Sequence, residues 1–206
     1  MIKITKEKLD LQDYFYIGYL YLIILGIVSD AIFYGIFGVS YLNYTTILDA
    51  LISPLSLLAN NWVLSFFLIF MFGLMYLYFT RWMPKLYKYL RVKKWYQKIY
   101  NIKKWDKRYE KLEDKKNLIP GLMILFFLLF VSMRTGMGLG MKHKYQTKEI
   151  SPNYTLVFKN NEKLDVRKIG QNSAYFFYFI PGETEITATP ISDNLKQIKR
   201  LKKKKK

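Results

Sequence analysis

Three long apolar segments, separated by polar ones, dominate the first two thirds of the chain. The clearest covers residues 62–80, where nineteen uncharged residues lie between an Asn-Asn pair and Arg81. Residues 14–38 and 118–137 have the same character, each with a single charged residue inside it. Because about 20 apolar residues are enough for a helix to cross the hydrocarbon core of a bilayer, this pattern predicts three transmembrane helices.

A shorter segment, residues 43–58, repeats its apolar positions at helical spacing, while polar side chains occupy the opposite face. Pro54 breaks this pattern, and the segment contains no Lys or Arg. Amphipathic helices of this kind lie in the membrane interface. We therefore expect an interfacial or re-entrant helix on the outer side of the membrane.

The pattern changes in residues 150–201, where alternating and aromatic runs are separated by turn-forming residues. Five strands are predicted, the fourth and fifth joined by a link of a single turn. In chain order they are YTLVFKNNEK, LDVRKIG, AYFFYFIP, EITATP and LKQIKRL. This number and spacing of strands, over about a quarter of the chain, resembles a small SH3-like or Sm-like barrel. The expected fold class is therefore an all-α membrane region, with three transmembrane helices and interfacial helices, followed by a small all-β module of SH3-like or Sm-like type.

Basic residues are distributed unevenly, which indicates an orientation in the membrane. Residues 14–80 contain no Lys or Arg, whereas residues 81–116 contain fourteen, with four acidic residues, for a net charge of +10. Short basic loops stay on the cytoplasmic side, so residues 81–116 are expected in the cytoplasm. Two crossings separate this segment from residues 1–13, so the N-terminus is expected in the cytoplasm too. A third crossing then carries the β domain to the outer side of a plasma (inner) membrane.

Two features oppose this side for the β domain. The polybasic tail, residues 196–206, favours the cytoplasm, although folded domains are translocated largely regardless of charge. A re-entrant third helix, with Pro120 near one end and Arg134 near the other, would also leave the β domain inside. Both alternatives stay open at the level of sequence.

Within residues 81–116, aromatic and apolar side chains recur mostly every three or four positions, and Lys and Arg occupy many of the others. A basic helix with such a stripe suits the surface of an anionic leaflet, where each Lys or Arg adds about 1 kcal/mol. The alternative is a solvated helical hairpin whose stripe packs on itself. The residues expected to contact anionic lipids of the inner leaflet are Trp82, Lys85, Lys88, Arg91, Lys93, Lys94, Trp95, Lys98, Lys103, Lys104 and Trp105.

Asp30 and Arg134 are the only charged residues within the three long apolar segments. Each follows the inner end of its helix, Tyr14 or Leu118, by sixteen positions, so both lie about 24 Å from that end. A charge at the bilayer centre costs about 2.5–3.5 kcal/mol. We expect either an intramembrane ion pair that docks the first helix on the third, or separate snorkelling of the two side chains to the outer headgroups.

No catalytic or cofactor-binding motif is recognisable in the sequence. The chain has no Cys, which excludes disulfides and thiolate metal sites, and its single histidine, His143, has no nearby ligand set. No nucleophile elbow, zinc-binding helix motif, P-loop or paired-Asp motif is present. We expect no cofactor and no enzymatic activity. The alternating glycines at positions 136, 138 and 140 predict a flexible exit from the third helix.

These features favour a non-enzymatic anchor, scaffold or accessory subunit that presents its β domain to a protein partner or assembles with copies of itself. The alternative is a subunit of an oligomeric channel or transporter with Asp30 near the pathway, since three spans are too few for a monomeric transporter. A third hypothesis, an enzyme acting on lipid, lacks an acid, base or nucleophile. Nucleic acid is not the expected partner, because packing explains the aromatic run AYFFYFIP and the charge flanks apolar spans. Abundant Lys, Ile, Asn and Tyr indicate an AT-rich, bacterial genome.

Overall fold

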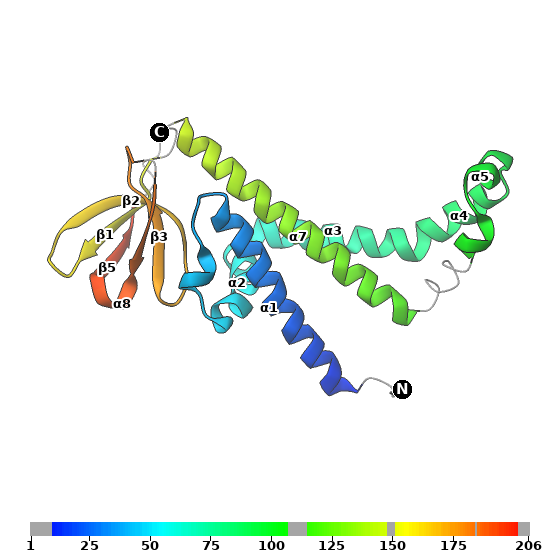
Figure 1. The fold of residues 1–206 in the computed structure, drawn as a ribbon, viewed down its shortest axis with the longest axis horizontal. Helices are drawn as coiled ribbons and strands as arrows, with labels where there is room; N and C mark the ends of the chain where they lie inside the picture. Colours follow the sequence, from blue (N-terminus) through cyan, green and yellow to red (C-terminus); the bar gives the residue numbers. More distant parts are fainter. Residues whose placement is uncertain (1–9, 107–114, 148–150, 184, 202–206) are drawn as a thin grey trace. The chain divides into compact units, whose positions relative to one another are not determined.

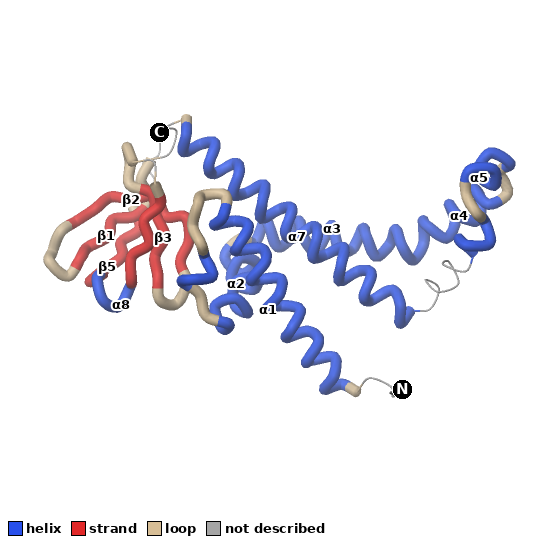
Figure 2. Tube along the Cα trace, in the orientation of Figure 1, coloured by secondary structure: helices blue, strands red, loops and turns tan. Residues whose placement is uncertain are grey.

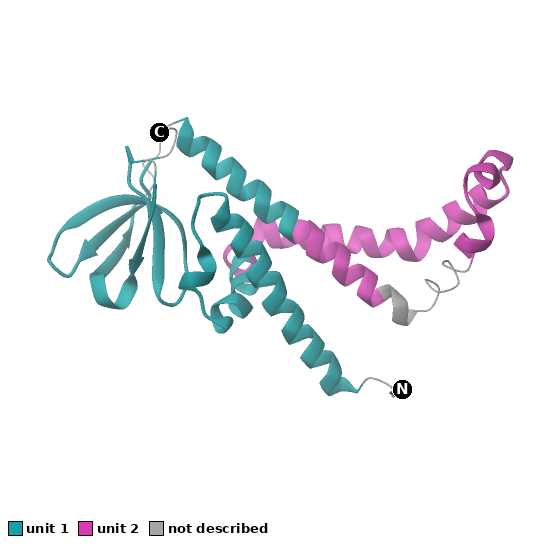
Figure 3. Cartoon of the chain, in the orientation of Figure 1, with its two compact units in different colours: residues 1–57, 131–206 teal, residues 58–130 magenta. Residues whose placement is uncertain are grey.

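A computed structural model describes residues 10–106, 115–147, 151–183 and 185–201. Helices occupy the first part of the chain and a sheet the last, as Figures 1 and 2 show. Among these described residues, three helices are long and apolar enough to cross a membrane, and the C-terminal sheet is antiparallel with five strands, so the predicted long apolar helices and five strands are confirmed. The chain divides into two compact units (Figure 3), unit 1 from residues 1–57 and 131–206 and unit 2 from residues 58–130.

The first helix of unit 1 is α1 (Leu11–Gly35). It starts and ends three residues earlier in the chain than the predicted span 14–38. A capping box fixes its start, because the Asp10 N–H donates to Asp13 Oδ2 at 2.9 Å while the Asp10 side chain accepts from the first turn. The two carboxylates thereby satisfy N–H groups that the first turn leaves unpaired. After α1 the chain turns at Gly38, whose φ of 81° suits glycine.

The predicted interfacial helix 43–58 consists of a 3₁₀ turn, η1 (Tyr41–Tyr44), and a helix, α2 (Ile47–Asn60). Thr46 caps α2, since its Oγ1 accepts from the Asp49 N–H at 3.1 Å and its N–H donates to Asp49 Oδ2, also at 3.1 Å. This reciprocal pair of bonds is the capping box of α2.

The helix α2 continues through Pro54, the residue that breaks its amphipathic pattern. A proline removes the hydrogen bond to the carbonyl four residues earlier, which here belongs to Ala50. Gly26 of α1 packs against this carbonyl so closely that a Cβ on Gly26 would overlap the oxygen. The two backbones are thus in direct contact, and glycine is what permits this packing of α1 on α2.

The helix α7 (Lys115–Gln146) continues well beyond the predicted span 118–137. Its 32 residues extend over about 48 Å. The three alternating glycines lie inside it, so the predicted flexible exit is wrong. One of them, Gly138, faces α1, and a Cβ there would meet Ile36 Cδ1 at 2.7 Å and Phe33 Cδ2 at 3.3 Å. Packing against α1 offsets the low helix propensity of glycine, about 1 kcal/mol per residue.

The C-terminal strands form one antiparallel sheet in the order β4-β3-β2-β1-β5. The nine residues of β2 pair first with β1 and then with β3, and a register shift lies between Lys168 and Gly170. A one-turn helix, α8 (Ile191–Asn194), joins β4 to β5 where a one-turn link was predicted. The strands are β1 (Tyr154–Phe158), β2 (Lys163–Gln171), β3 (Tyr175–Phe179), β4 (Ile186–Pro190) and β5 (Leu195–Arg200).

One face of the sheet encloses a small apolar core. Leu156 of β1 and Val166 of β2 are fully buried there. Because successive side chains of a strand point to opposite faces, both belong to the set of alternate positions that faces this core. The hydroxyl of the buried Tyr178 lies 3.0 Å from Thr189 Oγ1, so the polar end of this ring is satisfied. The buried members of this core are Leu156, Val166, Phe176, Tyr178 and Leu195.

Unit 2 contains α3 (Trp62–Leu77), which passes through a π-helical turn, η2 (Tyr78–Trp82), into α4 (Met83–Arg91). The apolar helix therefore extends beyond the predicted span 62–80, over the whole of Trp62–Arg91. Within the same unit α3 packs on the first part of α7, where the rings of Phe72 and Phe126 meet edge to face at 5.8 Å.

In residues 81–106, the described part of the basic segment that follows α3, the helix that began at Trp62 ends at Arg91 and the helices after it are short. After α4 come α5 (Lys94–Ile99) and a helical turn at residues 102–106, while residues 107–114 lie outside the described part of the chain. Extended backbone at Lys93 and Tyr100 limits α5 to six residues.

Candidate functional site: the junction of the membrane helices and the sheet

Asp30 of α1 and Arg134 of α7 form an ion pair inside unit 1. Arg134 Nη2 donates to Asp30 Oδ1 at 2.7 Å, and the two side chains are 11% and 2% exposed respectively. The guanidinium also lies over the ring of Phe33, 3.8 Å from its centroid. Buried pairs lose hydration that their attraction only roughly repays. This pair therefore specifies how α1 and α7 dock more than it adds net stability.

A second bond shows that α1 and α7 run in the same direction. Lys142 Nζ donates to the Ile36 carbonyl at 2.7 Å, just beyond the end of α1. The partners are 104 residues apart in the ion pair and 106 apart in this bond, as two parallel neighbouring helices require. A lysine on the last carbonyls also stabilises a helix C-terminus. The C-terminal ends of α1 and α7 therefore lie at the same end of this helix pair.

Aromatic side chains at the end of α1 and in η1 meet strand β3, and we name this contact the aromatic interface. Tyr34 stacks on Tyr41 with ring centroids 4.4 Å apart, and it meets Phe177 of β3 at 4.8 Å. From α7, Tyr145 stacks on Phe179 at 3.7 Å. Such pairs contribute about 0.5–1.5 kcal/mol each beyond the area that they bury. The interface comprises Phe33, Tyr34, Phe37, Tyr41 and Tyr44 on the helical side and Tyr175, Phe177 and Phe179 on β3.

The aromatic interface explains why β3, with the sequence YFFYF, has no polar position facing solvent. Phe176 and Tyr178 point into the core of the sheet, whereas Phe177 and Phe179 point toward the helices. All four are at most 2% exposed. A strand that is covered on both faces is apolar throughout. None of these four rings is therefore accessible for stacking on nucleic-acid bases.

A glycine of the sheet makes room for the aromatic interface. A Cβ on Gly170 of β2 would overlap the hydroxyl oxygen of Tyr34, which is only 3% exposed. Because Gly170 directly follows the register shift in β2, the bend and the glycine together bring the sheet onto the end of α1.

Polar bonds add to this docking from the turn between β2 and β3. The Ser173 N–H and hydroxyl donate to Asp49 at 3.0 and 3.1 Å, and Asn172 Nδ2 donates to the Tyr44 carbonyl at 2.7 Å. Partial burial alone would raise the pKa of Asp49, but hydrogen bonds from Ser173 and Thr46 outweigh it and lower that pKa below its ordinary value. Asp49 thus caps α2 and holds the sheet at the same time.

In unit 2, the residues expected to contact lipid are mostly exposed. Arg91 pairs with Asp106 at 3.1 Å, and Asp106 also accepts from the Tyr87 hydroxyl at 2.7 Å. Tyr87 and Tyr96 are buried, so part of the aromatic stripe packs within the segment. This is the packing that the alternative of a solvated helical hairpin requires. The cations, in contrast, face outward. Trp105 is half-buried, and the exposed residues are Trp82, Lys85, Lys88, Arg91, Lys93, Lys94, Trp95, Lys98, Lys103 and Lys104.

The aromatic interface and the tight contact at Gly170 were not predicted from the sequence. Two signals were available for them. The run YFFYF lacks the alternation of a half-buried strand, and residues 33–44 contain more Tyr and Phe than one end of a membrane helix needs.

Chemically, this junction is suited to fixing the sheet on the helices. Within the described ranges no three His, Cys, Asp or Glu side chains come together as a metal site would require, and His143 is exposed near the end of α7. The carboxylate of Asp30 is held by Arg134 and is closed off from solvent. No protein-family model matches this sequence, and no curated protein or solved structure matches it either.

Proposed function

We propose that this protein is a multi-pass membrane anchor or scaffold that holds a small barrel rigidly at the ends of two membrane helices and presents it to a protein partner. The observation that carries this proposal is the double burial of β3, whose Phe177 and Phe179 are covered by helix-borne aromatic rings. A mobile tethered domain would not need such a contact. A presented binding module gains from it, because a fixed orientation lowers the entropy cost of binding.

The topology of the sheet supports an SH3-like or Sm-like barrel as the identity of this module. The order β4-β3-β2-β1-β5 lets the long second strand serve both halves of the sheet, and a register shift bends it between them. The one-turn helix α8 between β4 and β5 fits the same architecture. The outward positions of β1, β5 and the first half of β2 are then the surface offered to a partner.

The parallel arrangement of α1 and α7 supports a barrel on the outer side of the plasma (inner) membrane. The segment 81–116 is cytoplasmic in this proposal because of its charge. Residues 1–13 are separated from it by two crossings and therefore lie on the same side. Since α7 is a single helix of 32 residues, a re-entrant hairpin within 118–137 has no support in the backbone. The apolar stripe of α2, with Leu48, Ile52 and Leu55 exposed by 48–62%, then lies in the outer interface.

An oligomeric channel or transporter subunit has less support. Asp30, the residue expected near its pathway, is paired with Arg134 within one chain and is 1% exposed. A charge so enclosed has no access to an aqueous path through this fold.

Sidedness is tested with single cysteines, which the absence of native Cys makes simple. Lys98→Cys and Gln197→Cys, both at exposed positions, are labelled in intact cells with a membrane-impermeant maleimide. We expect labelling at position 197 alone. Labelling at neither position before lysis would put the barrel in the cytoplasm and overturn the outer placement.

The scaffold role is tested by photo-cross-linking in cells. A photoreactive phenylalanine analogue replaces Gln197 on the barrel or Phe66 on α3, both of which are exposed. A scaffold gives a discrete heterologous adduct from position 197, whose partner is then identified by mass spectrometry. Three results together would support the channel instead. Position 66 would give adducts of twice the mass of the chain, position 197 would give none, and Asp30→Asn would alter an ion flux.

A further inference from the structure

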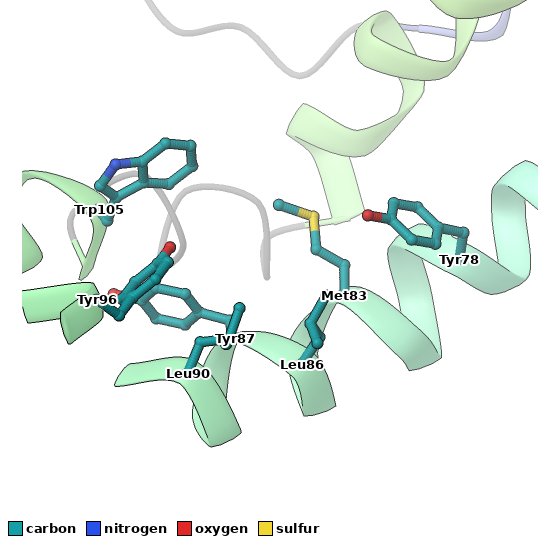
Figure 4. A pocket seen from close by; sticks show the side chains of 7 residues that line it. All are labelled: Tyr78, Met83, Leu86, Tyr87, Leu90, Tyr96 and Trp105. Carbon is teal, nitrogen blue, oxygen red and sulfur yellow. The ribbon is translucent and has the colours of Figure 1, made fainter. Parts of the chain in front are cut away.

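Unit 2 contains an apolar pocket of about 170 Å³ within the basic segment (Figure 4). One wall is the apolar face of α4, where Met83, Leu86, Tyr87 and Leu90 recur at helical spacing. Tyr96 and Trp105 line the pocket from beyond α4, and Tyr78 lies at its end nearest α3. Because Leu86 is 48% exposed, the pocket reaches the surface of the unit.

The surroundings of this pocket carry a large positive charge with little internal compensation. Residues 81–106 contain nine Lys and Arg but a single carboxylate, Asp106. That carboxylate is occupied by Arg91 and by the Tyr87 hydroxyl. Arg81, Lys85 and Lys88 lie within two residues of lining positions and are exposed. An occupant that complements this region has an apolar part for the pocket and an anionic group for the cations.

We propose that the pocket binds one acyl chain of an anionic phospholipid, whose phosphate pairs with Arg81, Lys85 and Lys88. The position in the chain favours a lipid, because α3 continues without a break into α4 and the pocket therefore lies where an apolar span gives way to headgroup-contacting residues. Soluble anions would use the cations but leave the apolar wall unfilled. This site deepens the proposed anchoring role, and it rests on the cytoplasmic placement of the basic segment.

The test uses the full chain in lipid discs, with Trp105 as the reporter. The substitutions Trp62→Phe, Trp82→Phe and Trp95→Phe leave Trp105 as the single tryptophan. The discs consist of phosphatidylcholine with a small fraction of phosphatidylglycerol or phosphatidylcholine brominated on its acyl chain. We expect the brominated phosphatidylglycerol to quench Trp105 at several-fold lower fraction than brominated phosphatidylcholine, saturating near one lipid per chain. Equal quenching by the two lipids would overturn the proposal.

A matched pair of charge variants separates a discrete site from general surface attraction. Lys85→Gln with Lys88→Gln is compared with Lys98→Gln with Lys104→Gln, which removes the same charge away from the α4 wall. The first pair should weaken the apparent affinity for phosphatidylglycerol by roughly ten- to thirty-fold, and the second pair by much less. Equal losses would mean that no discrete site exists.

A packing variant tests the acyl-chain part of the proposal. Leu86→Phe fills the pocket and should abolish the preferential quenching, whereas Ile99→Phe, at a position 66% exposed and outside the pocket, should preserve it. If Leu86→Phe leaves the quenching intact, the chain does not enter the pocket. Cysteine labelling at positions 98 and 197 does not involve the pocket, so failure of this proposal is distinguishable from failure of the proposed topology.

Discussion

Replacing Arg134 with Met is expected to destabilise the protein strongly, because it leaves the Asp30 carboxylate buried without its cation. The Asp30 side chain is 2% exposed, and it accepts a hydrogen bond from the Arg134 guanidinium at 2.7 Å. Removing one member of a buried pair costs about 3–5 kcal/mol. Met is a conservative choice, since its thioether retains a favourable contact with the ring of Phe33.

The double substitution Asp30→Leu with Arg134→Met removes both charges and should restore most of this loss, since apolar replacements of buried pairs are often neutral or stabilising. Lys142→Met serves as a control, because it also removes a cation from α7 but at an exposed position. Its cost should stay near that of exposed charge interactions, about 0–1 kcal/mol.

Thermal unfolding in detergent, followed by circular dichroism, measures these differences. For a chain of this size 1 kcal/mol corresponds to about 2–4 °C in Tm, so Arg134→Met should unfold roughly 6–20 °C lower. The double variant should lie within a few degrees of the unsubstituted protein. A loss below about 1 kcal/mol for Arg134→Met, or a double variant that shows the sum of two single losses, would refute the coupling and favour separate snorkelling.

Three further substitutions test individual contacts. Gly170→Ala should lower the unfolding free energy by about 1–3 kcal/mol because its Cβ overlaps the Tyr34 hydroxyl, and adding Tyr34→Phe should recover part of it; no recovery in thermal unfolding would locate the strain elsewhere. Gly26→Ala should be similarly destabilising, whereas Gly18→Ala, with nothing within 4 Å, should stabilise α1 by up to about 1 kcal/mol, and equal effects would disprove the close packing on α2. Asp49→Asn should cost about 0.5–2 kcal/mol at neutral pH. The pKa of Asp49 is lowered in the folded state. The charge of Asp49 therefore adds to the unfolding free energy above its ordinary pKa, and this contribution is lost as the pH falls below about 4. Denaturation curves of the variant should accordingly depend less on pH in that acid range.

The sequence was sufficient for the elements whose information is local. Apolar runs of about 20 residues or more, close to the length that crosses a bilayer, identified α1, α3 and α7, and turn residues separated the five strands and the α8 link. The start of α1 was also readable, since Asp10 and Asp13 have the spacing of a capping box, yet hydropathy alone put it at Tyr14.

What could not be read locally depends on contacts between distant parts of the chain. Pro54 and Gly138 carry unfavourable helix propensities and both are helical. Gly138 packs directly against α1, and the Ala50 carbonyl that Pro54 leaves without its helical hydrogen bond packs against Gly26 of α1. The double burial of Phe177 depends on residues more than 130 positions earlier. The depth of Asp30 and Arg134 along their helices gave a reason to consider a pair, but their juxtaposition follows from the parallel packing of α1 and α7.

The double burial of β3 also determines when this protein is able to finish folding. The helical half of the aromatic interface is synthesised first, and at about 5–20 residues per second β3 follows it on the order of ten seconds later. During that interval Tyr34 and Tyr41 have no β3 to pack against. The membrane interface is a favourable environment for such rings. Tyr145, which covers Phe179, is delivered only when α7 has formed. The outer face of β3 is therefore covered completely only after the third helix has inserted. A C-terminal fragment made alone would expose Phe177 and Phe179, and this apolar surface would promote aggregation.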